Sequence, residues 1–381
     1  GASTTFSVFT GLDAMGSAHG LDVPTGDLRL VADLDAHVVD GAWAWAPADL
    51  VDTDGAPWPT CARTFARRME DAATHRGLRL QASFESEFTA WHGDGSPLHE
   101  QPAYGVEATR ASGPFLLAIV RRLQALGVEV DQVHPEYSPG QLEVSVGRTG
   151  AVAAADRVVL VRDVIRTVAR ELGLRVSFSA KPSPESLGNG AHLHLSLWND
   201  TQNLFADDSE LRECFIGGLI AHLPALTALT CGSVNSFRRL APRTWASAYA
   251  VYGPDNREAA IRICSPLGES GEPNLELKPS DSSANPYLSL GAVIHAGLDG
   301  IRRKLDPGEA VDVDPDTRPG RYQRLPASLE EALDALEADE LLMEALGPLR
   351  RSAYLAVKRS EAAAFAAQDA SYELFHHMRV F

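Results

Sequence analysis

Acidic and histidine side chains recur at the two-residue spacing of a β-strand. Glu85 and Glu87 lie in FESEF, and His192 and His194 lie in NGAHLHLSL. Residues two apart on a strand leave the same face of a sheet, so each pair points in one direction. Such side chains are the usual ligands of metal ions, although a single Glu or His among apolar residues more often marks the solvated face of a strand.

Three further acids lie in comparable settings. Glu136 and Glu143 flank the turn YSPGQ, which can bring the two acids together, and Glu276 lies in the apolar strand NLELK. Carboxylates that converge on one face would repel one another, whereas two divalent ions would supply about four positive charges. Ligands that are mostly carboxylates with one imidazole favour Mg²⁺ or Mn²⁺ over a thiolate zinc site. The sequence therefore predicts a site for two or more such ions.

Three arginines follow within a short stretch of chain. Arg239 lies in NSFRRLAP, and Arg257 and Arg262 lie in DNREAAIRIC. Planar guanidinium groups match both phosphoryl and carboxylate anions, so these residues are candidates for binding either one. The alternative is that they are solvated surface arginines. Lys278 follows Glu276 by two residues and so faces the same way.

Charge and motif content exclude several classes of protein. The 381 residues carry 34 Lys and Arg against 51 Asp and Glu, a net charge of −17, which disfavours nucleic acid and anionic membrane surfaces as partners. The chain contains neither GxxxxGK[ST] nor GxGxxG, so a bound nucleotide would depend on metal ions and arginines. We find no signal-peptide pattern and no long apolar run, and the four cysteines form no CxxC pair. These features predict a cytoplasmic protein without a membrane segment.

The periodicity of apolar residues predicts an α+β protein in which pairs of strands alternate with long helices. Strands are expected at 27–33, 41–46, 79–90, 128–134, 141–147, 175–180, 191–198, 247–252, 259–264 and 274–278. Helices are expected at 62–76, 113–127, 151–173, 209–229, 284–304, 328–346 and 349–370. The order favours a curved, mainly antiparallel sheet with flanking helices. The turn-rich segment 53–60 predicts a division between a small module, 1–56, and a larger domain, 57–381.

Six segments in the same order resemble the glutamine synthetase family. FESEF resembles the family's EPEF strand, HPEYSPGQLEV its HxEvapGQxE segment, and NSFRRLAP its NSYKRLvPg segment. KPSPESLGNGAHLHLSL, DNREAAIRIC and LELKPSDSSANPYLSLGAVIHAGLDGI match three more motifs between residues 181 and 301. The resemblance implies a glutamine synthetase-type catalytic domain. Because few residues precede Glu85, it also implies that residues 1–56 form only a partial β-grasp module.

The resemblance implies a reaction in which ATP phosphorylates the γ-carboxylate of glutamate and an amine then displaces phosphate. It assigns one divalent ion to Glu87, Glu136 and Glu143, and a second to Glu85, His192 and Glu276. Arg239 would bind the glutamate carboxylate, and Arg257 and Arg262 would bind the phosphates. Asn189, Gly190 and Tyr104 would line the amino-acid pocket, and His194 and Ser196 would lie along the nucleotide. Asp13, a looser match, would belong to an acidic loop that is inserted into the active site of a neighbouring subunit. The resemblance also implies a homo-oligomer of stacked hexameric rings, a dodecamer.

Departures from the family pattern bear on the substrate. Trp245 stands where ammonia-using members carry a glutamate that deprotonates ammonium, and an indole cannot accept that proton. Its face would suit the chain or the charge of a larger amine. Arg243 replaces a glycine beside it, and Lys278 replaces an arginine that could hold a carboxylate with two hydrogen bonds. These differences leave open whether the acid is glutamate itself or a close analogue.

The sequence therefore favours an ATP-dependent ligase that joins a glutamate-like acid to a primary amine such as an alkylamine, ethanolamine or a polyamine. One alternative is an ordinary glutamine synthetase with an altered ammonia pocket. A noncatalytic protein of the same fold is the other alternative, since folds do not determine activity.

Overall fold

A computed structural model describes residues 2–3, 27–206, 209–266 and 272–381. Its strands are β1 (Ala2–Ser3), β2 (Asp27–Ala32), β3 (Val38–Asp40), β4 (Trp43–Trp45), β5 (Ala48–Val51), β6 (Arg79–Trp91), β7 (Val130–Pro135), β8 (Gln141–Val146), β9 (Thr149–Gly150), β10 (Arg175–Ser177), β11 (Leu193–Trp198), β12 (Tyr252–Pro254), β13 (Ile261–Cys264) and β14 (Asn274–Leu277). Its α-helices are α1 (Ala62–Thr74), α2 (Val106–Ala125), α3 (Ala151–Glu171), α4 (Glu210–Thr230), α5 (Ser236–Arg239), α6 (Pro286–Arg303), α7 (Leu329–Ala338), α8 (Glu340–Leu346), α9 (Pro348–Ala366) and α10 (Ala370–Val380).

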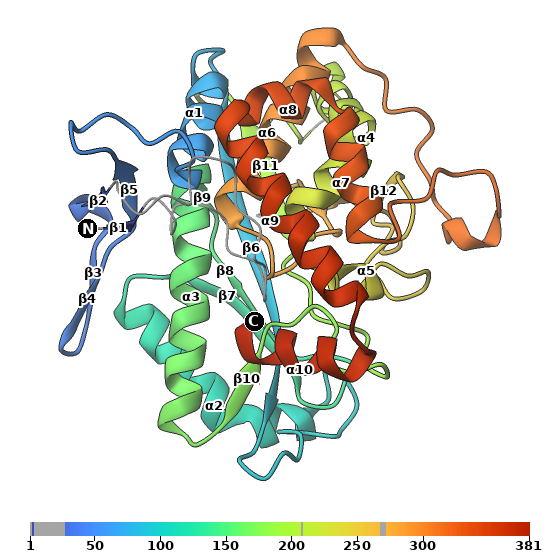
Figure 1. Ribbon diagram of the computed structural model, residues 1–381. Coiled ribbons are helices and arrows are strands. Elements are labelled where there is room, and N and C mark those ends of the chain that lie inside the picture. Colours follow the sequence, from blue (N-terminus) through green and yellow to red (C-terminus); the bar gives the residue numbers. More distant parts are fainter. Residues whose placement is uncertain (1, 4–26, 207–208, 267–271) are drawn as a thin grey trace.

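A nine-stranded sheet forms the centre of the protein. Its main path runs β12-β13-β14-β11-β6-β8-β7, and β9 and β10 also pair with β6. Only β12 and β13 are parallel; the other pairings within this sheet are antiparallel. The long strand β6 passes through the middle of the molecule and pairs with four other strands (Figure 1). These features confirm the predicted α+β fold with a mainly antiparallel sheet.

Two apolar cores hold helices against this sheet. The larger core contains the apolar residues of α1, α4 and α6 together with those of β6 and β11. The smaller one lies between α2, α3 and β8, where Phe88 contacts Phe115 and Phe178 at ring-centroid distances of 6.1 and 5.4 Å. Both cores pack against the face of β6 that carries Phe84 and Phe88, which gives the side chains on the opposite face of this strand a rigid support.

Glycines permit the close packing of α4 against α6. A Cβ atom at Gly218 would lie 2.2 Å from the carbonyl oxygen of Ala296, and one at Gly300 would lie 2.0 Å from that of Cys214. No side chain fits at such distances, so the glycines are required by the approach of the two backbones. Helix α4 is long and apolar enough to cross a membrane, but 78% of its most apolar window is buried in the protein, as in a core helix.

The N-terminal strands form a separate small layer at one edge of the molecule (Figure 1). Strands β1, β2 and β5 make an antiparallel sheet, and β3 and β4 pair beside it. Arg63 of α1 joins this layer to the larger domain through ion pairs with Asp33 at 2.6 Å, Asp49 at 3.2 Å and Asp156 at 2.9 Å. The division after residue 56 stays a prediction.

Several expected elements differ from the observed ones. Helix α2 begins at Val106, before the expected 113, and α10 was not expected as a separate helix. The helix expected over 328–346 is broken at Asp339, whose backbone is extended and whose side chain caps α8 and contacts His222. The strand expected at 247–252 is instead a loop up to Val251, since Ser247 has a positive φ of 67°.

Candidate active site

A cavity of about 750 Å³ opens over one end of the large sheet. Most of the candidate residues line it: Glu85, Glu87, Tyr104, Glu136, Glu143, His192, His194, Arg239, Trp245, Arg257, Arg262, Glu276 and Lys278. They come from β6, the β7–β8 hairpin, β11 and the residue before it, α5 and the loop after it, β13, and β14 and the residue after it; Tyr104 precedes α2, and Arg257 lies between β12 and β13. The chain therefore brings together side chains that are far apart in the sequence.

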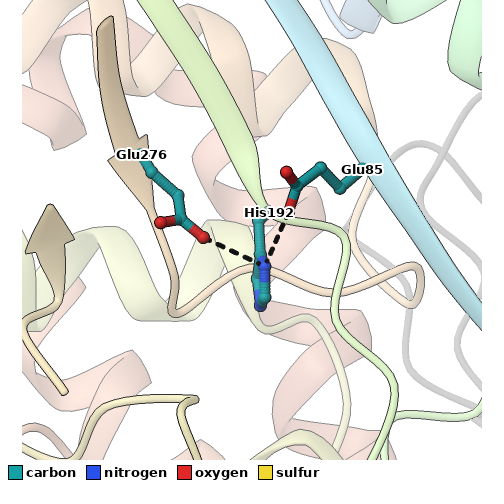
Figure 2. A group of neighbouring side chains, drawn as sticks. All are labelled: Glu85, His192 and Glu276. Carbon is teal, nitrogen blue, oxygen red and sulfur yellow. Dashed lines mark hydrogen bonds and ion pairs between the residues drawn. The ribbon is translucent and has the colours of Figure 1, made fainter. Parts of the chain in front are cut away.

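Glu85, His192 and Glu276 form the first acidic group (Figure 2). The Nδ1 atom of His192 lies 3.1 Å from Oε2 of Glu85 and 3.2 Å from Oε1 of Glu276. The pairing of β11 with both β6 and β14 places the three residues side by side, with Glu276 only 2% exposed. Ligand atoms from all three lie within 4.8 Å of one another, so together they could hold one metal ion.

The charges of this first group depend on one another. Burial alone would raise the pKa of the Glu85 carboxyl, but the imidazoles of His194 and His192 hold it well below its usual range. Burial opposes ionisation of Glu276 in the same way, and Lys278 and His192 keep its pKa well below normal. Both carboxylates are therefore anionic at neutral pH, as metal ligands must be.

His134, Glu136 and Glu143 form the second acidic group. The Nδ1 atom of His134 lies 3.2 Å from Oε1 of Glu136, and its Nε2 atom lies 3.3 Å from Oε1 of Glu143. The register of the β7–β8 hairpin makes His134 the direct cross-strand partner of Glu143. Burial would lower the pKa of His134, but the two carboxylates raise it to about 10. His134 was not among the predicted ligands, although it begins the motif HPEYSPGQ.

Glu87 lies beside the second acidic group but is not one of its three members. It is the cross-strand partner of Glu143, but its Oε2 atom accepts hydrogen bonds from Nε2 of Gln141 at 3.0 Å and from the N–H of Gly190 at 2.9 Å. Its Oε1 atom lies 3.7 Å from Nε2 of His192, between the two groups. The assignment of Glu87 as a metal ligand stays a prediction.

The acidic groups fit divalent cations. Burial and the negative charges of Glu85 and Glu87 raise the pKa of Glu143, even though His134 lowers it. A divalent cation beside this buried carboxyl would oppose both causes and favour its ionised form. Oxygen ligands with one imidazole in each group suit Mg²⁺ or Mn²⁺, as the sequence predicts.

Arg239 lies directly beside the first group. It is 2% exposed, and its Nη2 atom donates to Nε2 of His192 at 2.9 Å and to the carbonyl of Lys278 at 3.1 Å. Arg262 approaches from β13, with Nη1 3.3 Å from Oε2 of Glu276. Arg257 is exposed at the rim of the cavity. The three arginines thus lie from the floor to the mouth of one cavity.

Lys278 and His194 complete the surroundings of these carboxylates. The Nζ atom of Lys278 donates to Oε1 of Glu276 at 2.8 Å, and this lysine is 3% exposed. The Nε2 atom of His194 lies 2.9 Å from Oε1 of Glu85, and its Nδ1 atom lies 2.8 Å from Oδ1 of Asn274. Ser196 lines an adjoining cavity of about 370 Å³, which shares Glu85 and His194 with the main one.

Asn189 and Gly190 act behind the cavity wall. The side-chain amide of Asn189 donates to Oγ1 of Thr89 at 3.1 Å and to the carbonyl of Ser179 at 2.9 Å, so it is buried away from the opening. A Cβ atom at Gly190 would lie 2.6 Å from both Nη2 of Arg239 and Nε2 of His192. Glycine at this position therefore lets the arginine and the histidine meet. Asp13 lies outside the described residues.

Three aromatic rings form a corner above the second acidic group. The indole of Trp245 stacks on Tyr137, with ring centroids 4.5 Å apart and planes at 25°. Tyr104 meets Tyr137 edge-on at 5.6 Å, and its hydroxyl donates to Oε1 of Glu136 at 2.9 Å. Burial and the Glu136 carboxylate raise the pKa of Tyr104 and keep its hydroxyl protonated. Sequence reasoning missed Tyr137, because its partner in this corner is distant along the chain.

Residues 59–377 match the sequence profile of the family described as "Glutamine synthetase, catalytic domain". The chain is 42% identical to a gamma-glutamylpolyamine synthetase of Streptomyces coelicolor, over 95% of this chain and 83% of that protein. It is 34% identical to a glutamate–methylamine ligase of Methyloversatilis universalis, over 78% of this chain and 72% of that protein. It is 32% identical to a glutamine synthetase of Halobacterium salinarum, over 94% of this chain and 84% of that protein.

Two solved structures resemble the whole fold. A glutamine synthase homolog superposes with a TM-score of 0.84 at 39% identity, over 94% of this chain and 86% of that one. A complex of GmaS with ADP also gives a TM-score of 0.84, at 31% identity, over 92% of this chain and 85% of that one. The similarity to these two structures therefore covers most of the chain and not only the residues that line the cavity.

Proposed function

The chain belongs to the glutamine synthetase family, and from this premise we propose that it joins glutamate, or a close analogue, to a primary organic amine at the expense of ATP. The family and the relatives that act on amines make it an ATP-dependent carboxylate–amine ligase. The choice of an organic amine over ammonia is the specific part of the proposal. Among such amines, we propose a polyamine, because the relative at 42% identity is a gamma-glutamylpolyamine synthetase.

The proposed reaction has two steps. A γ-carboxylate oxygen of the acid attacks the γ-phosphorus of ATP, and ADP leaves. The amine nitrogen then attacks the carbonyl carbon of this acyl phosphate, the C–O bond to phosphate breaks, and inorganic phosphate leaves as the nitrogen loses a proton. The product is a γ-glutamyl amide.

The first step depends on balancing the charge of the phosphates. Divalent cations, when bound, would supply charge neutralisation for the phosphoryl group. Glu85, His192 and Glu276 would hold one, and Glu136 and Glu143, with Glu87 or His134, would hold the other. Arg257 and Arg262, which both line the cavity, would bind phosphate oxygens.

Arg239 and Lys278 would hold the acid. Arg239 is fixed by three acceptors and presents its guanidinium beside His192. Lys278 offers a single charged point, where an arginine could offer two parallel hydrogen bonds. Asp13 would supply an anion for the amine from outside the described residues.

One observation carries the preference for an organic amine. Trp245 and Tyr137 present stacked aromatic faces in the cavity, next to Glu136 and Glu143. An aromatic face binds an alkyl chain through apolar contact and a second ammonium group through cation–π attraction. Ammonia has no chain to use these faces.

The test is phosphate release from ATP with Mg²⁺, glutamate and one amine at a time. The panel would contain spermidine, putrescine, methylamine, ethanolamine and ammonium. We expect release only when acid and amine are both present, with a higher kcat/KM for at least one organic amine than for ammonium. Release supported by ammonium but by no organic amine would instead assign an ordinary glutamine synthetase, a function that the relative from Halobacterium salinarum bears by name.

We also propose that the protein acts as a cytoplasmic homo-oligomer, with hexameric rings and sites shared between subunits. The N-terminal layer exposes large apolar side chains, including Leu30 at 57%, Val31 at 52% and Trp43 at 79%. Such exposure favours contact with another subunit. Light scattering of the purified protein would give the number of subunits.

A further inference from the structure

A strained turn borders the aromatic corner. The backbone φ is 61° at Arg243, 55° at Trp245 and 67° at Ser247, and it is 57° at Tyr104 on the other side of the corner. Left-handed angles are unfavourable for residues with side chains and persist only where surrounding contacts hold them. Strained residues of this kind gather at functional sites, so the contacts that fix this turn are of interest.

Glu258 makes those contacts. Its Oε2 atom accepts a hydrogen bond from the N–H of Arg243, and its Oε1 atom accepts one from the N–H of Trp245, each at 3.1 Å. One carboxylate thus holds two of the strained residues, Arg243 and Trp245, through both of its oxygens. Hydrogen bonds to a charged acceptor are stronger than those between neutral groups. Asn256 fixes Glu258 in turn, since its Oδ1 atom accepts from the N–H of Glu258 at 3.0 Å.

The held turn connects the backbone of Arg239 to the aromatic corner. The hydroxyl of Thr244 lies 3.0 Å from the carbonyl oxygen of Arg239 and 2.7 Å from that of Ala241, so the turn is tied to the backbone of the buried arginine. On its other side, Trp245 stacks on Tyr137. Tyr137 is 49% exposed, and both rings line the cavity, so part of the stacked surface is available to a ligand.

We infer that Glu258 is a positioning residue, which holds the turn 243–245 so that Trp245 lies against Tyr137. In this arrangement, Tyr137 determines specificity by contacting the hydrocarbon chain of a diamine or polyamine. The inference rests on the proposed function and deepens it. It states that the stacked rings of Trp245 and Tyr137, held in place by the carboxylate of Glu258, determine which amine is used. Glu258 itself does not line the cavity described above, so it acts through Trp245 rather than on the substrate.

The first test replaces Tyr137. Tyr137→Val removes the ring, and we expect kcat/KM for spermidine to fall about tenfold while kcat/KM for ammonium changes less than about threefold. Tyr137→Phe keeps the ring and should keep most of the preference for spermidine. Phe375→Val, which removes an exposed ring on α10, is the matched control for losing a surface aromatic residue. An unchanged ratio of spermidine to ammonium in Tyr137→Val would overturn the role of Tyr137.

The second test replaces Glu258 by glutamine. The Gln oxygen can still accept one backbone hydrogen bond, but its NH₂ group cannot accept the other. We expect Glu258→Gln to raise the KM for spermidine about tenfold, with the KM values for glutamate and ATP within about twofold of the wild type. A general structural defect would instead move all three values together, and that result would overturn the positioning role.

Relief of the strain provides a rescue. Glycine adopts a φ near 61° without penalty, so adding Arg243→Gly to Glu258→Gln should lower the KM for spermidine again. No recovery in the double variant would contradict the positioning role. If none of the organic amines supports phosphate release by the wild-type protein, the proposed function is wrong, and this inference is wrong with it. If wild type uses spermidine and only the variants behave otherwise than expected, this inference alone is overturned.

Discussion

Glu87 and Glu143 are direct partners across the antiparallel pairing of β6 and β8, so two buried carboxylates face each other in one sheet. Like charges directly opposite each other destabilise a sheet. The pair is therefore kept for a purpose other than stability. A divalent cation between the strands would turn the repulsion into attraction.

The first prediction concerns removal of cations. Because the pKa of Glu143 is raised, its ionised form costs stability at neutral pH when no cation is bound. We expect EDTA to lower the Tm of the wild type, and Mg²⁺ or Mn²⁺ to restore it. In Glu143→Gln, the cation-free Tm should equal or exceed that of the wild type, and added metal should have much less effect. Thermal scans with and without metal would check this, and a wild-type Tm that ignores both additions would argue against the cation sites.

The second prediction concerns the first acidic group. Glu276→Ala should reduce kcat by at least about a hundredfold, because it removes a metal ligand and leaves Lys278 and Arg262 without their buried partner. Glu87→Ala should have a comparable effect. Both rates are measured by ADP formation, with circular dichroism to establish that each variant is folded. A folded Glu276→Ala protein that turns over near the wild-type rate would disprove the role of this residue.

The third prediction concerns Trp245. Trp245→Glu introduces a carboxylate where ammonium could be bound and deprotonated, and it removes the stacking face for a longer amine. We expect the ratio of kcat/KM for ammonium to that for spermidine to rise by about tenfold or more. Trp245→Phe serves as the control that keeps an aromatic face. An amine profile that is the same in Trp245→Glu and wild type would place selectivity elsewhere.

The fourth prediction concerns pH and His222, which is not among the residues that line the cavity. His222 of α4 bridges Asp339 at 2.6 Å and Asp299 at 3.2 Å. Burial would lower the pKa of His222, but the two carboxylates raise it above its usual value. A raised folded pKa gives stability that is fully present below the unfolded pKa, about 6.5, and is lost as the pH rises through the folded value.

We therefore expect His222→Gln to destabilise the protein more at pH 6 than at pH 9, as measured by urea unfolding at the two values. Asp334→Asn, an exposed acid of α7, is a control that should show no such difference. Equal loss at both pH values for His222→Gln would mean that the ion pairs contribute nothing.

Local patterns predicted much of the site, because strand alternation is a property of neighbouring residues. The spacing in FESEF and in NGAHLHLSL placed Glu85, Glu87 and His192 on faces that do meet in the cavity. The helix over 284–304 was also close to the observed α6, whose start is marked by Asn285 as a cap and Pro286 in the first turn.

Features that depend on tertiary contacts were not predicted. Tyr137 and Trp245 stack although 108 positions separate them, and no local pattern reports such a meeting. The role of Glu258 depends on positive φ values at Arg243 and Trp245, which neither residue type favours. The break between α7 and α8 arises because the side chain of Asp339 caps α8 and contacts His222 on another helix.

Transfer of an oxygen atom tests the central claim most directly. Glutamate labelled with ¹⁸O in its γ-carboxylate would be incubated with ATP, Mg²⁺ and spermidine, and the inorganic phosphate and the amide would be analysed by mass spectrometry. We predict one ¹⁸O atom in each phosphate released, together with γ-glutamylspermidine. Unlabelled phosphate, or labelled phosphate formed with ammonium but with no organic amine, would contradict the account.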